Sequence, residues 1–431
     1  THTVPYIIGV AALKATGIKS SYSTSDPSIW ISGFGGEYGY SEEYNPGLID
    51  LAYEPAMMTT DQTGCEAGYV SYYYYPGNEF EDCWNYINGP HPDNIDGNYT
   101  NTFGGTSSAA PSVAGAIAVL LSAYPDLTWR DVKHIMASTG RKSDPERSYS
   151  KNGLVQHDWI TNAAGYTHHY WYGFGAFDLG AAIDFASTYT PDSLGTFNEF
   201  GWKKAIPKET INVSIAANSS GTGNIYVIDG IRRKSLFLNV GTTYTFIHSS
   251  AHPLRFSTTP DGTHAGGVEY VEGVTKSNGI TTIKVTEDTP TLYYYCAVHS
   301  EMGADISFFD TGAIQNLNLS IPSFSSVEDT IPYLSETTGN FTEFIQIKIY
   351  LDKEIPKDIG MHLISPQGTE MSILQPFSNV SGNPSGDWFV MGISGFYGEQ
   401  INGDWTLKVT DYTDNSDTGI LVDWEINIFG N

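Results

Sequence analysis

The pattern of apolar and polar positions changes along this 431-residue chain. The first part combines continuous apolar runs with helical periods, as in α/β structure, and the rest has the short strand-like runs of β-sandwiches. Two continuous apolar runs near the beginning, residues 6–13 and 29–34, have the length of strands buried on both faces. Helical patterns follow over residues 109–123, 128–137 and 179–187. The second begins at Thr128, which forms a capping-box-like start with an acid three residues on. This order predicts an α/β region over residues 1–192.

The rest of the chain follows the period of β-strands. Between residues 223 and 306, short strand-like runs and turns recur at regular spacing, which predicts a small β-sandwich. Residues 311–431 are also predicted to be all-β, because Phe344–Tyr350 alternates with period two and later strands carry inward aromatic residues. The Pro-, Gly-, Asn- and Ser-rich residues 193–222 are predicted to be a linker. The alternative is that Gly201–Val213 begins the last module and that the middle module is inserted after it.

Composition narrows the partners that the protein can have. The length allows about two to four domains, and a formal net charge of −27 argues against nucleic acid or an anionic membrane as a partner. No apolar run is expected to span a membrane. The charge suits a secreted protein and offers carboxylates for calcium, for which the candidates are Asp404, Asp411, Asp414 and Asp417. The alternative is that these carboxylates on turns are only solvated.

The three cysteines divide into a pair and a single residue. Cys65 and Cys83 lie close together in a turn-rich, aromatic region, so a disulfide between them is predicted if the protein is exported. Two free thiols are the alternative. Cys296 lies apart, in a sequence context of its own.

Ser107 is a candidate nucleophile, because it follows a glycine pair and lies at the start of a predicted helix. Gly104 and Gly105 deliver Ser107 to the start of an apolar helix of small residues, which we expect to lie deep in a core. The unpaired N–H groups and the positive end of the helix dipole favour negative charge beside the hydroxyl. The same N–H groups can donate to the oxyanion that forms when the hydroxyl attacks a carbonyl. An ordinary N-cap serine is the alternative.

The motif Gly-Thr-Ser-x-Ala-x-Pro over residues 105–111 resembles the nucleophile motif of subtilisin-like serine proteases, which implies Ser107 as the nucleophile. The resemblance is to the second half of a kexin-like subtilase domain and covers residues 1 to about 190. The stretches that carry it are the strand at 7–10, Ser-Tyr-Ser at 21–23, Leu-Thr-Trp-Arg-Asp-Val at 127–132 and Tyr-Gly-Phe-Gly at 172–175.

The catalytic triad that the resemblance implies is incomplete in this chain. In the family an Asp and then a His precede the Ser, with an oxyanion-hole Asn between His and Ser, and the His must lie within hydrogen-bond reach of the Ser. Only His2 and His91 precede Ser107, and neither lies in a motif of the family. The chain also begins with Thr1 rather than Met. We therefore expect an upstream part of the same protease domain to supply Asp, His and Asn, and the chain alone not to hydrolyse peptides.

A second set of chemistry-bearing residues lies in the middle module. Cys296, His299 and Met302 follow a strand, and His252 comes some forty residues earlier. A soft thiolate, two imidazoles and a weak thioether are the ligands of a blue-copper centre. The module thus resembles the cupredoxins, whose ligand positions these four residues match, and the resemblance implies bound copper. The alternatives are a buried Cys with incidental His and Met, or a cupredoxin fold that no longer binds metal. His248 ranks below His252, since it lies within a strand.

The last module resembles the P domain that follows the catalytic domain in kexin and the proprotein convertases. Ser-Pro-Gln-Gly-Thr at 365–369 and Gly-Asp-Trp-Thr-Leu-Lys-Val-Thr-Asp at 403–411 carry this resemblance. It implies a jelly-roll-like sandwich that packs on the protease and supports its stability.

Two functions fit this sequence. The first is a secreted serine endopeptidase of the subtilisin/kexin type that acts on proteins or peptides, of which this chain holds the part from mid-catalytic domain onward. The second is a non-catalytic copper-binding or interaction protein built on a degenerate protease fold. Both share one architecture, an incomplete α/β subtilase-like domain followed by a cupredoxin-like and a P-domain sandwich. Electron transfer is the cupredoxin default, and a role of copper in structure or adhesion is the alternative.

Overall fold

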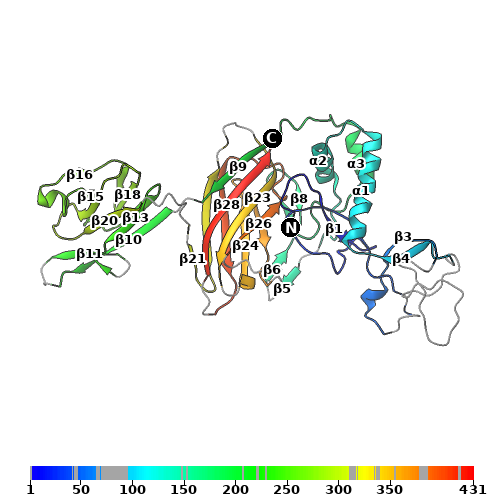
Figure 1. Ribbon diagram of the computed structural model, residues 1–431, viewed down its shortest axis with the longest axis horizontal. Helices are drawn as coiled ribbons and strands as arrows, with labels where there is room; N and C mark the ends of the chain where they lie inside the picture. Colours follow the sequence, from blue (N-terminus) through cyan, green and yellow to red (C-terminus); the bar gives the residue numbers. More distant parts are fainter. Residues whose placement is uncertain are drawn as a thin grey trace. The chain divides into compact units, whose positions relative to one another are not determined.

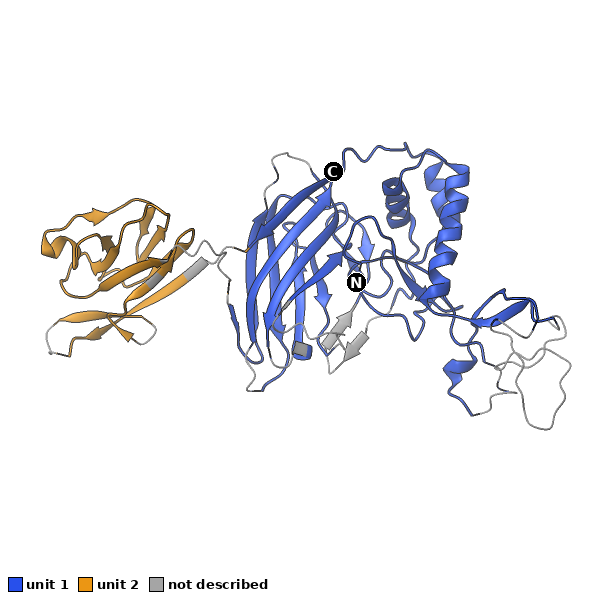
Figure 2. Ribbon diagram, viewed as in Figure 1, with its two compact units in different colours: residues 1–204, 319–431 blue, residues 205–318 orange. Residues whose placement is uncertain are grey.

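The computed structural model describes the chain except for residues 1, 41, 43–46, 65–67, 69–95, 147–148, 152–153, 206–207, 220–222, 229–230, 310–316, 318, 334, 336–339, 354–355, 378–386 and 416–418. The chain forms two compact units (Figure 2). Unit 1 comprises Thr1–Lys204 and Leu319–Asn431, and unit 2 comprises Ala205–Asn318. Unit 2 is therefore inserted into unit 1 along the chain.

The first part of unit 1 has the predicted α/β character. Strand β1 (Gly9–Leu13) pairs in parallel with β2 (Ile29–Phe34), as expected for two continuous apolar runs. The helices are α1 (Thr106–Ala123), α2 (Trp129–Thr139) and α3 (Leu179–Ala186). The Thr128 capping box is confirmed, because both of its hydrogen bonds with Asp131 are present. These strands and helices share a core that includes Trp30, Ile31, Val113, Leu120, Ile135, Met136 and Phe174.

Short antiparallel strand pairs and one 3-10 helix complete this part of unit 1. They are η1 (Asp50–Tyr53), β3 (Met57–Thr60) with β4 (Tyr99–Phe103), β5 (Tyr149–Lys151) with β6 (Leu154–His157), and β7 (Ile160–Thr161) with β8 (Thr167–His168). Cys65 and Cys83, for which a disulfide is predicted, lie outside the described residues.

Helix α1 is less buried than its small residues led us to expect. One face packs closely on β2, where a Cβ atom added to Gly33 would lie 2.6 Å from Val113 Cγ2. The opposite face, which includes Ala110, Ala114 and Val119, is exposed. The expected deep burial is therefore wrong for that face, since no described segment covers it. Among the described helices α1 alone is long and apolar enough to cross a membrane, contrary to the expectation that no such run exists; a core helix of a soluble protein has the same length and composition.

The C-terminal sandwich, which we define as β9 with β21–β28, is the second part of unit 1 (Figure 1). One sheet has the order β21-β28-β23-β26, with β9 also paired to β28, and the other has the order β22-β27-β24-β25. Its core includes the fully buried Trp405 and Trp424. The elements are β9 (Asn198–Lys204), β21 (Leu319–Ile321), β22 (Ser326–Tyr333), β23 (Thr342–Asp352), η3 (Pro356–Asp358), β24 (Ile359–Ile364), β25 (Glu370–Leu374), β26 (Asp387–Ile393), β27 (Gly403–Asp411) and β28 (Gly419–Gly430).

Unit 2 is a sandwich of two sheets. Its six-stranded sheet has the order β12-β11-β10-β14-β18-β17 and its five-stranded sheet the order β13-β20-β19-β15-β16. The first consists of β10 (Lys208–Ala217), β11 (Asn224–Ile228), β12 (Ile231–Arg232), β14 (Thr243–Ile247), β17 (Val274–Ser277) and β18 (Ile280–Lys284). The second consists of β13 (Leu236–Asn239), β15 (Leu254–Ser257), β16 (Glu269–Tyr270), β19 (Leu292–Cys296) and β20 (Ala304–Phe309), and η2 (Gly262–Ala265) lies between β15 and β16.

Residues 193–222 differ from the linker predicted for them. They contain β9, which pairs with β28 in the C-terminal sandwich, and β10, which lies inside the six-stranded sheet of unit 2. The composition of this stretch resembles that of a linker, but long-range ladder hydrogen bonds place most of it in sheets. The alternative, in which Gly201–Val213 begins the last module, agrees with the structure up to Lys204 and is wrong for the rest of that stretch, because β10 belongs to unit 2.

Candidate functional sites

Ser107 is the second residue of α1 and is exposed. The preceding Gly105 has φ of 89°, a conformation that favours glycine and that turns the chain into the helix. The neighbouring Ser108 is different, because it is buried and its Oγ donates to the carbonyls of Gly105 at 2.8 Å and Gly35 at 3.0 Å. Of the two adjacent serines, Ser107 is thus the one whose hydroxyl can meet a substrate.

The segment Ser21–Tyr22 supports the loop beside this serine. The Tyr22 hydroxyl lies 2.8 Å from the Gly35 carbonyl oxygen and 2.6 Å from that of Gly36. A Cβ atom at Gly35 would lie 2.8 Å from the carbonyl oxygen of Gly105, so the β2 end and the start of α1 approach each other too closely for a side chain. The helix start that carries Ser107 is therefore held from two sides.

No described histidine lies beside Ser107. The backbone of His2 donates to Ser28 Oγ, and its ring lies next to Gly9, at the beginning of β1 and β2. Ser107 instead lies near the other end of β2, where Gly35 approaches Gly105. His91, the other histidine before Ser107, lies outside the described residues. Within the described residues, the structure therefore brings together no serine–histidine pair at this helix start.

The later histidines of unit 1 have structural partners. His134 Nδ1 lies 2.9 Å from the Tyr397 hydroxyl, and burial lowers the pKa of His134. His168 Nε2 lies 3.0 Å from the Ile29 carbonyl, and burial lowers its pKa to about 4. The backbone N–H of Trp171 donates to His169 Nδ1 at 3.0 Å. Each of these three histidines therefore takes part in a hydrogen bond within unit 1.

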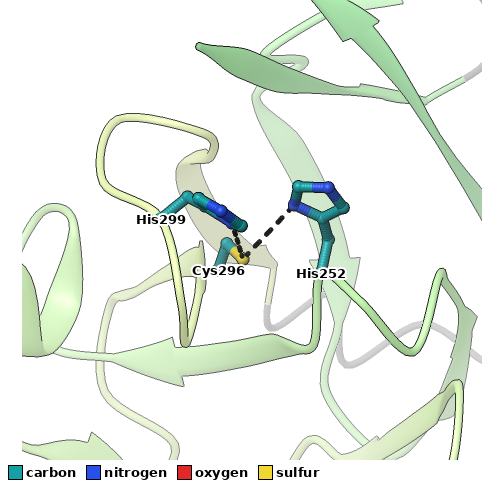
Figure 3. A group of neighbouring side chains, drawn as sticks. All are labelled: His252, Cys296 and His299. Carbon is teal, nitrogen blue, oxygen red and sulfur yellow. Dashed lines mark hydrogen bonds between the residues drawn. The ribbon is translucent and has the colours of Figure 1, made fainter.

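Three of the four predicted copper ligands meet in unit 2 (Figure 3). Cys296 Sγ lies 3.9 Å from His252 Nδ1 and 3.8 Å from His299 Nδ1, and the two imidazole centroids are 4.6 Å apart. Cys296 is a buried free thiol, His252 is half-buried and His299 is exposed. Burial and the neighbouring His299 lower the pKa of His252, which keeps its imidazole neutral, the form that binds metals.

The distances in this cluster fit a metal centre. A thiol carries one proton and can donate to only one of two imidazoles, yet both Nδ1 atoms face the same sulfur. Around a metal with bonds of about 2.0–2.3 Å, sulfur and nitrogen ligands lie roughly 3.6–3.8 Å apart. The cluster is thus close to the spacing that a shared metal ion requires.

The strand ladder explains why residues 44 positions apart meet here. Cys296 ends β19 and pairs with Leu254 of β15, so His252 arrives at the same end of the sheet. Met302, the fourth predicted ligand, is fully buried in the same core cluster as Cys296.

His248 is not part of the cluster. Its Nε2 lies 3.0 Å from Thr281 Oγ1 and its Nδ1 lies 3.0 Å from the Ser249 carbonyl oxygen, so both ring nitrogens already have partners.

One residue that contacts the cluster has no signal in the sequence. The Tyr226 hydroxyl donates to the His252 carbonyl at 2.7 Å from a strand of the other sheet. A tyrosine in an alternating strand looks like any core residue, and only the tertiary structure shows its neighbour.

The candidate calcium ligands do not form a cluster among the described residues. Asp411 is fully buried in an ion pair of 3.0 Å with Lys353, and its other oxygen accepts from Thr413. Asp404 and Asp414 are exposed, and Asp417 lies outside the described residues. Calcium stays a prediction that rests on the sequence alone.

Family models match two parts of the chain. Residues 74–175, which include Ser107, match the subtilase family, and residues 342–428 match the proprotein convertase P-domain. The chain carries a subtilase segment and a P-domain. The P-domain match lies inside the C-terminal sandwich, and the subtilase match contains α1 and α2.

Two relatives are similar to parts of this chain. The chain is 35% identical over 207 residues to the extracellular serine protease of Aeromonas sobria. The aligned region covers 45% of this chain and 30% of that protein. It is 38% identical over 86 residues to human proprotein convertase subtilisin/kexin type 7, covering 20% of this chain and 10% of that protein. The chain thus spans less than a third of the length of these relatives.

The crystal structure of the serine protease of Aeromonas sobria has a similar fold. It superposes with a TM-score of 0.59 at 22% identity, over 98% of this chain and 57% of that protein. The mostly β, subtilase-like fold of the chain is therefore shared with a solved subtilase.

Proposed function

We propose that this chain is part of a secreted serine endopeptidase in which Ser107 is the nucleophile. The observation that carries the proposal is the exposed Ser107 hydroxyl at the start of α1, next to a serine that is buried and committed to the backbone. The match to the subtilase family and the names of the relatives, which are extracellular or convertase-type proteases, support secretion and protein substrates.

In this proposal the Ser107 oxygen attacks the peptide carbonyl, and its own backbone N–H donates to the oxyanion that forms. The free N–H groups of the first helical turn lower the energy of that negative charge. A histidine from outside the described residues would take the hydroxyl proton, and an aspartate would orient it. The described residues therefore bind the reacting carbonyl and supply the nucleophile, and the base comes from another part of the protease domain.

A fluorophosphonate probe applied to the full gene product tests this proposal. We expect covalent labelling of Ser107, lost in Ser107→Ala and retained in Ser122→Ala, an exposed serine at the other end of the same helix. A folded gene product that is not labelled at Ser107 would overturn the proposal. It would favour the second hypothesis, a non-catalytic binding protein on a protease fold.

We also propose that unit 2 binds copper through His252, Cys296 and His299, with Met302 as a weak fourth ligand. A thiolate and two imidazoles with convergent donor atoms suit copper or zinc, and a thioether favours copper. Bound copper would supply one-electron transfer. The chain would hold the two imidazoles and the Cys296 sulfur at the spacing of the cluster, and burial of Cys296 keeps water from the sulfur.

Titration with Cu(II) tests the metal proposal. We expect one equivalent to bind with an absorption band near ~600 nm, which Cys296→Ser abolishes. His248→Asn is the matched control and should keep the band, since its imidazole contacts Thr281 and Ser249 instead. Colourless protein that binds no metal would remove the proposal, and tight zinc without copper binding would replace it with a structural zinc site.

A further inference from the structure

Tyr226 contacts the predicted copper ligands from the opposite sheet of unit 2. It belongs to β11 in the six-stranded sheet and is fully buried. Its hydroxyl donates to the carbonyl oxygen of His252 at 2.7 Å. Its backbone N–H donates to the carbonyl oxygen of Met302 at 3.0 Å. One residue thus joins the segments that carry ligands from both sides of the cluster.

The same hydroxyl also faces the sulfur of the cluster. A hydrogen bond links the side chains of Tyr226 and Cys296. Its ring packs against Tyr294, 6.1 Å away, two positions before Cys296 in β19.

We propose that Tyr226 is a positioning residue that holds the two ligand-bearing loops of unit 2 together for metal binding. The inference rests on the proposed copper centre. His252 lies in the connection between β14 and β15, and the other ligands lie at the end of β19 and in the turn before β20. Next to these loops, the β15–β19 ladder ends with the pair Leu254–Cys296 and with the bond of 2.8 Å from the Ala297 N–H to the Pro253 carbonyl.

Tyr226 adds the contacts that the ladder does not supply. Its hydroxyl fixes the carbonyl of His252 itself, and this contact sets where the imidazole leaves the backbone. Residues that hydrogen-bond to ligand residues orient them, and their loss typically costs about 10- to 100-fold in metal affinity. An ordinary core tyrosine would affect stability alone, without this selective effect on the metal.

The variant Tyr226→Phe tests the proposal, with Tyr294→Phe as its matched control. Both tyrosines are buried in one core, and the Tyr294 hydroxyl donates to the Lys234 carbonyl at 2.8 Å, away from the ligands. Each variant loses one buried hydroxyl-to-carbonyl bond and keeps its ring, so both should lower the unfolding temperature similarly. We expect copper affinity to fall about 10- to 100-fold in Tyr226→Phe and less than about threefold in Tyr294→Phe. Equal affinities in the two variants would overturn the proposal.

A second measurement uses the metal-free protein and separates this inference from the copper proposal. Cys296 is fully buried, so alkylation of its thiol requires the loops to open. Loss of one hydrogen bond between them should speed alkylation about fivefold in Tyr226→Phe, measured by mass spectrometry of the Cys296 peptide, and not in Tyr294→Phe. If the wild type binds no copper, the metal proposal fails and this rate decides the inference about Tyr226. The same rate in both variants would then refute it.

Discussion

Lys133 offers a quantitative test of how the subtilase segment packs on the P-domain. Its side chain is buried, donates to the Pro5 carbonyl at 2.7 Å and lies 3.9 Å from the centroid of the Trp30 ring. The ring of Phe344, in the P-domain, is 5.6 Å away. Burial lowers the pKa of Lys133 from 10.5 to about 7. The ammonium form is therefore disfavoured in the folded protein.

The sign and the size of the effect follow from this shift. Between about pH 7 and pH 10.5 the unfolded chain holds the Lys133 proton and the folded chain does not, so stability rises with pH. One pKa unit corresponds to about 1.4 kcal/mol. Below about pH 7 both the folded and the unfolded chain hold the proton, so stability does not change there. Between pH 6 and pH 9, stability therefore rises over about two pH units, from pH 7 to pH 9. Wild type should therefore gain about 2.7 kcal/mol from this residue across that range.

The test compares wild type with Lys133→Met in urea unfolding at pH 6 and pH 9. All nine tryptophans lie in the residues of unit 1, so tryptophan fluorescence follows this unit without a signal from unit 2. The variant loses the bond to Pro5 at both pH values, and other titrating groups cancel in the difference. We expect the stability of wild type relative to the variant to be about 2.7 kcal/mol more favourable at pH 9. A difference that is equal at both pH values would refute the reasoning.

Three further substitutions test other contacts of unit 1 by the same unfolding assay. Glu343→Gln leaves the buried guanidinium of Arg130 without its charged partner and should cost about 3 kcal/mol, whereas an effect below about 1 kcal/mol would show that the pair is solvated. Thr128→Ala removes the side-chain cap of α2 and should cost about 1 kcal/mol, with Thr128→Ser as the neutral control. Gly33→Ala should cost roughly 1–3 kcal/mol, since its Cβ would meet α1 at 2.6 Å, whereas Gly115→Ala has open space and should stabilise the same helix.

Local elements of the fold could be predicted from the sequence. The strand predicted over residues 29–34 has those bounds in the structure, and the capping box at Thr128 starts α2 as expected. In both cases the signal lies within a few residues of the element, as a continuous apolar run or a cap and an acid one helical turn apart. The residue types of the cluster in unit 2 could be recognised for the same reason, since Cys296 and His299 share one short loop.

Local patterns could not predict which distant segments pair or pack together. Residues 193–222 have the composition of a linker, but β9 pairs Lys204 with Glu425, 221 residues away, and β10 pairs Lys208 with Thr243, 35 residues away. The exposed face of α1 could not be foreseen either, because small apolar residues favour close packing whether or not a neighbour is present.

The sequence by itself determined short-range features of this protein: that residues 29–34 form a strand, that Thr128 caps a helix, that Ser107 lies at a helix start, and which residue types could bind a metal. Only the tertiary structure decided that unit 2 is inserted in unit 1, that His252 meets Cys296, and that Tyr226 reaches both from the other sheet. The physical reason is that hydrophobic period and capping act over a few residues. Strand register and the approach of two sheets depend instead on contacts between segments far apart in the chain.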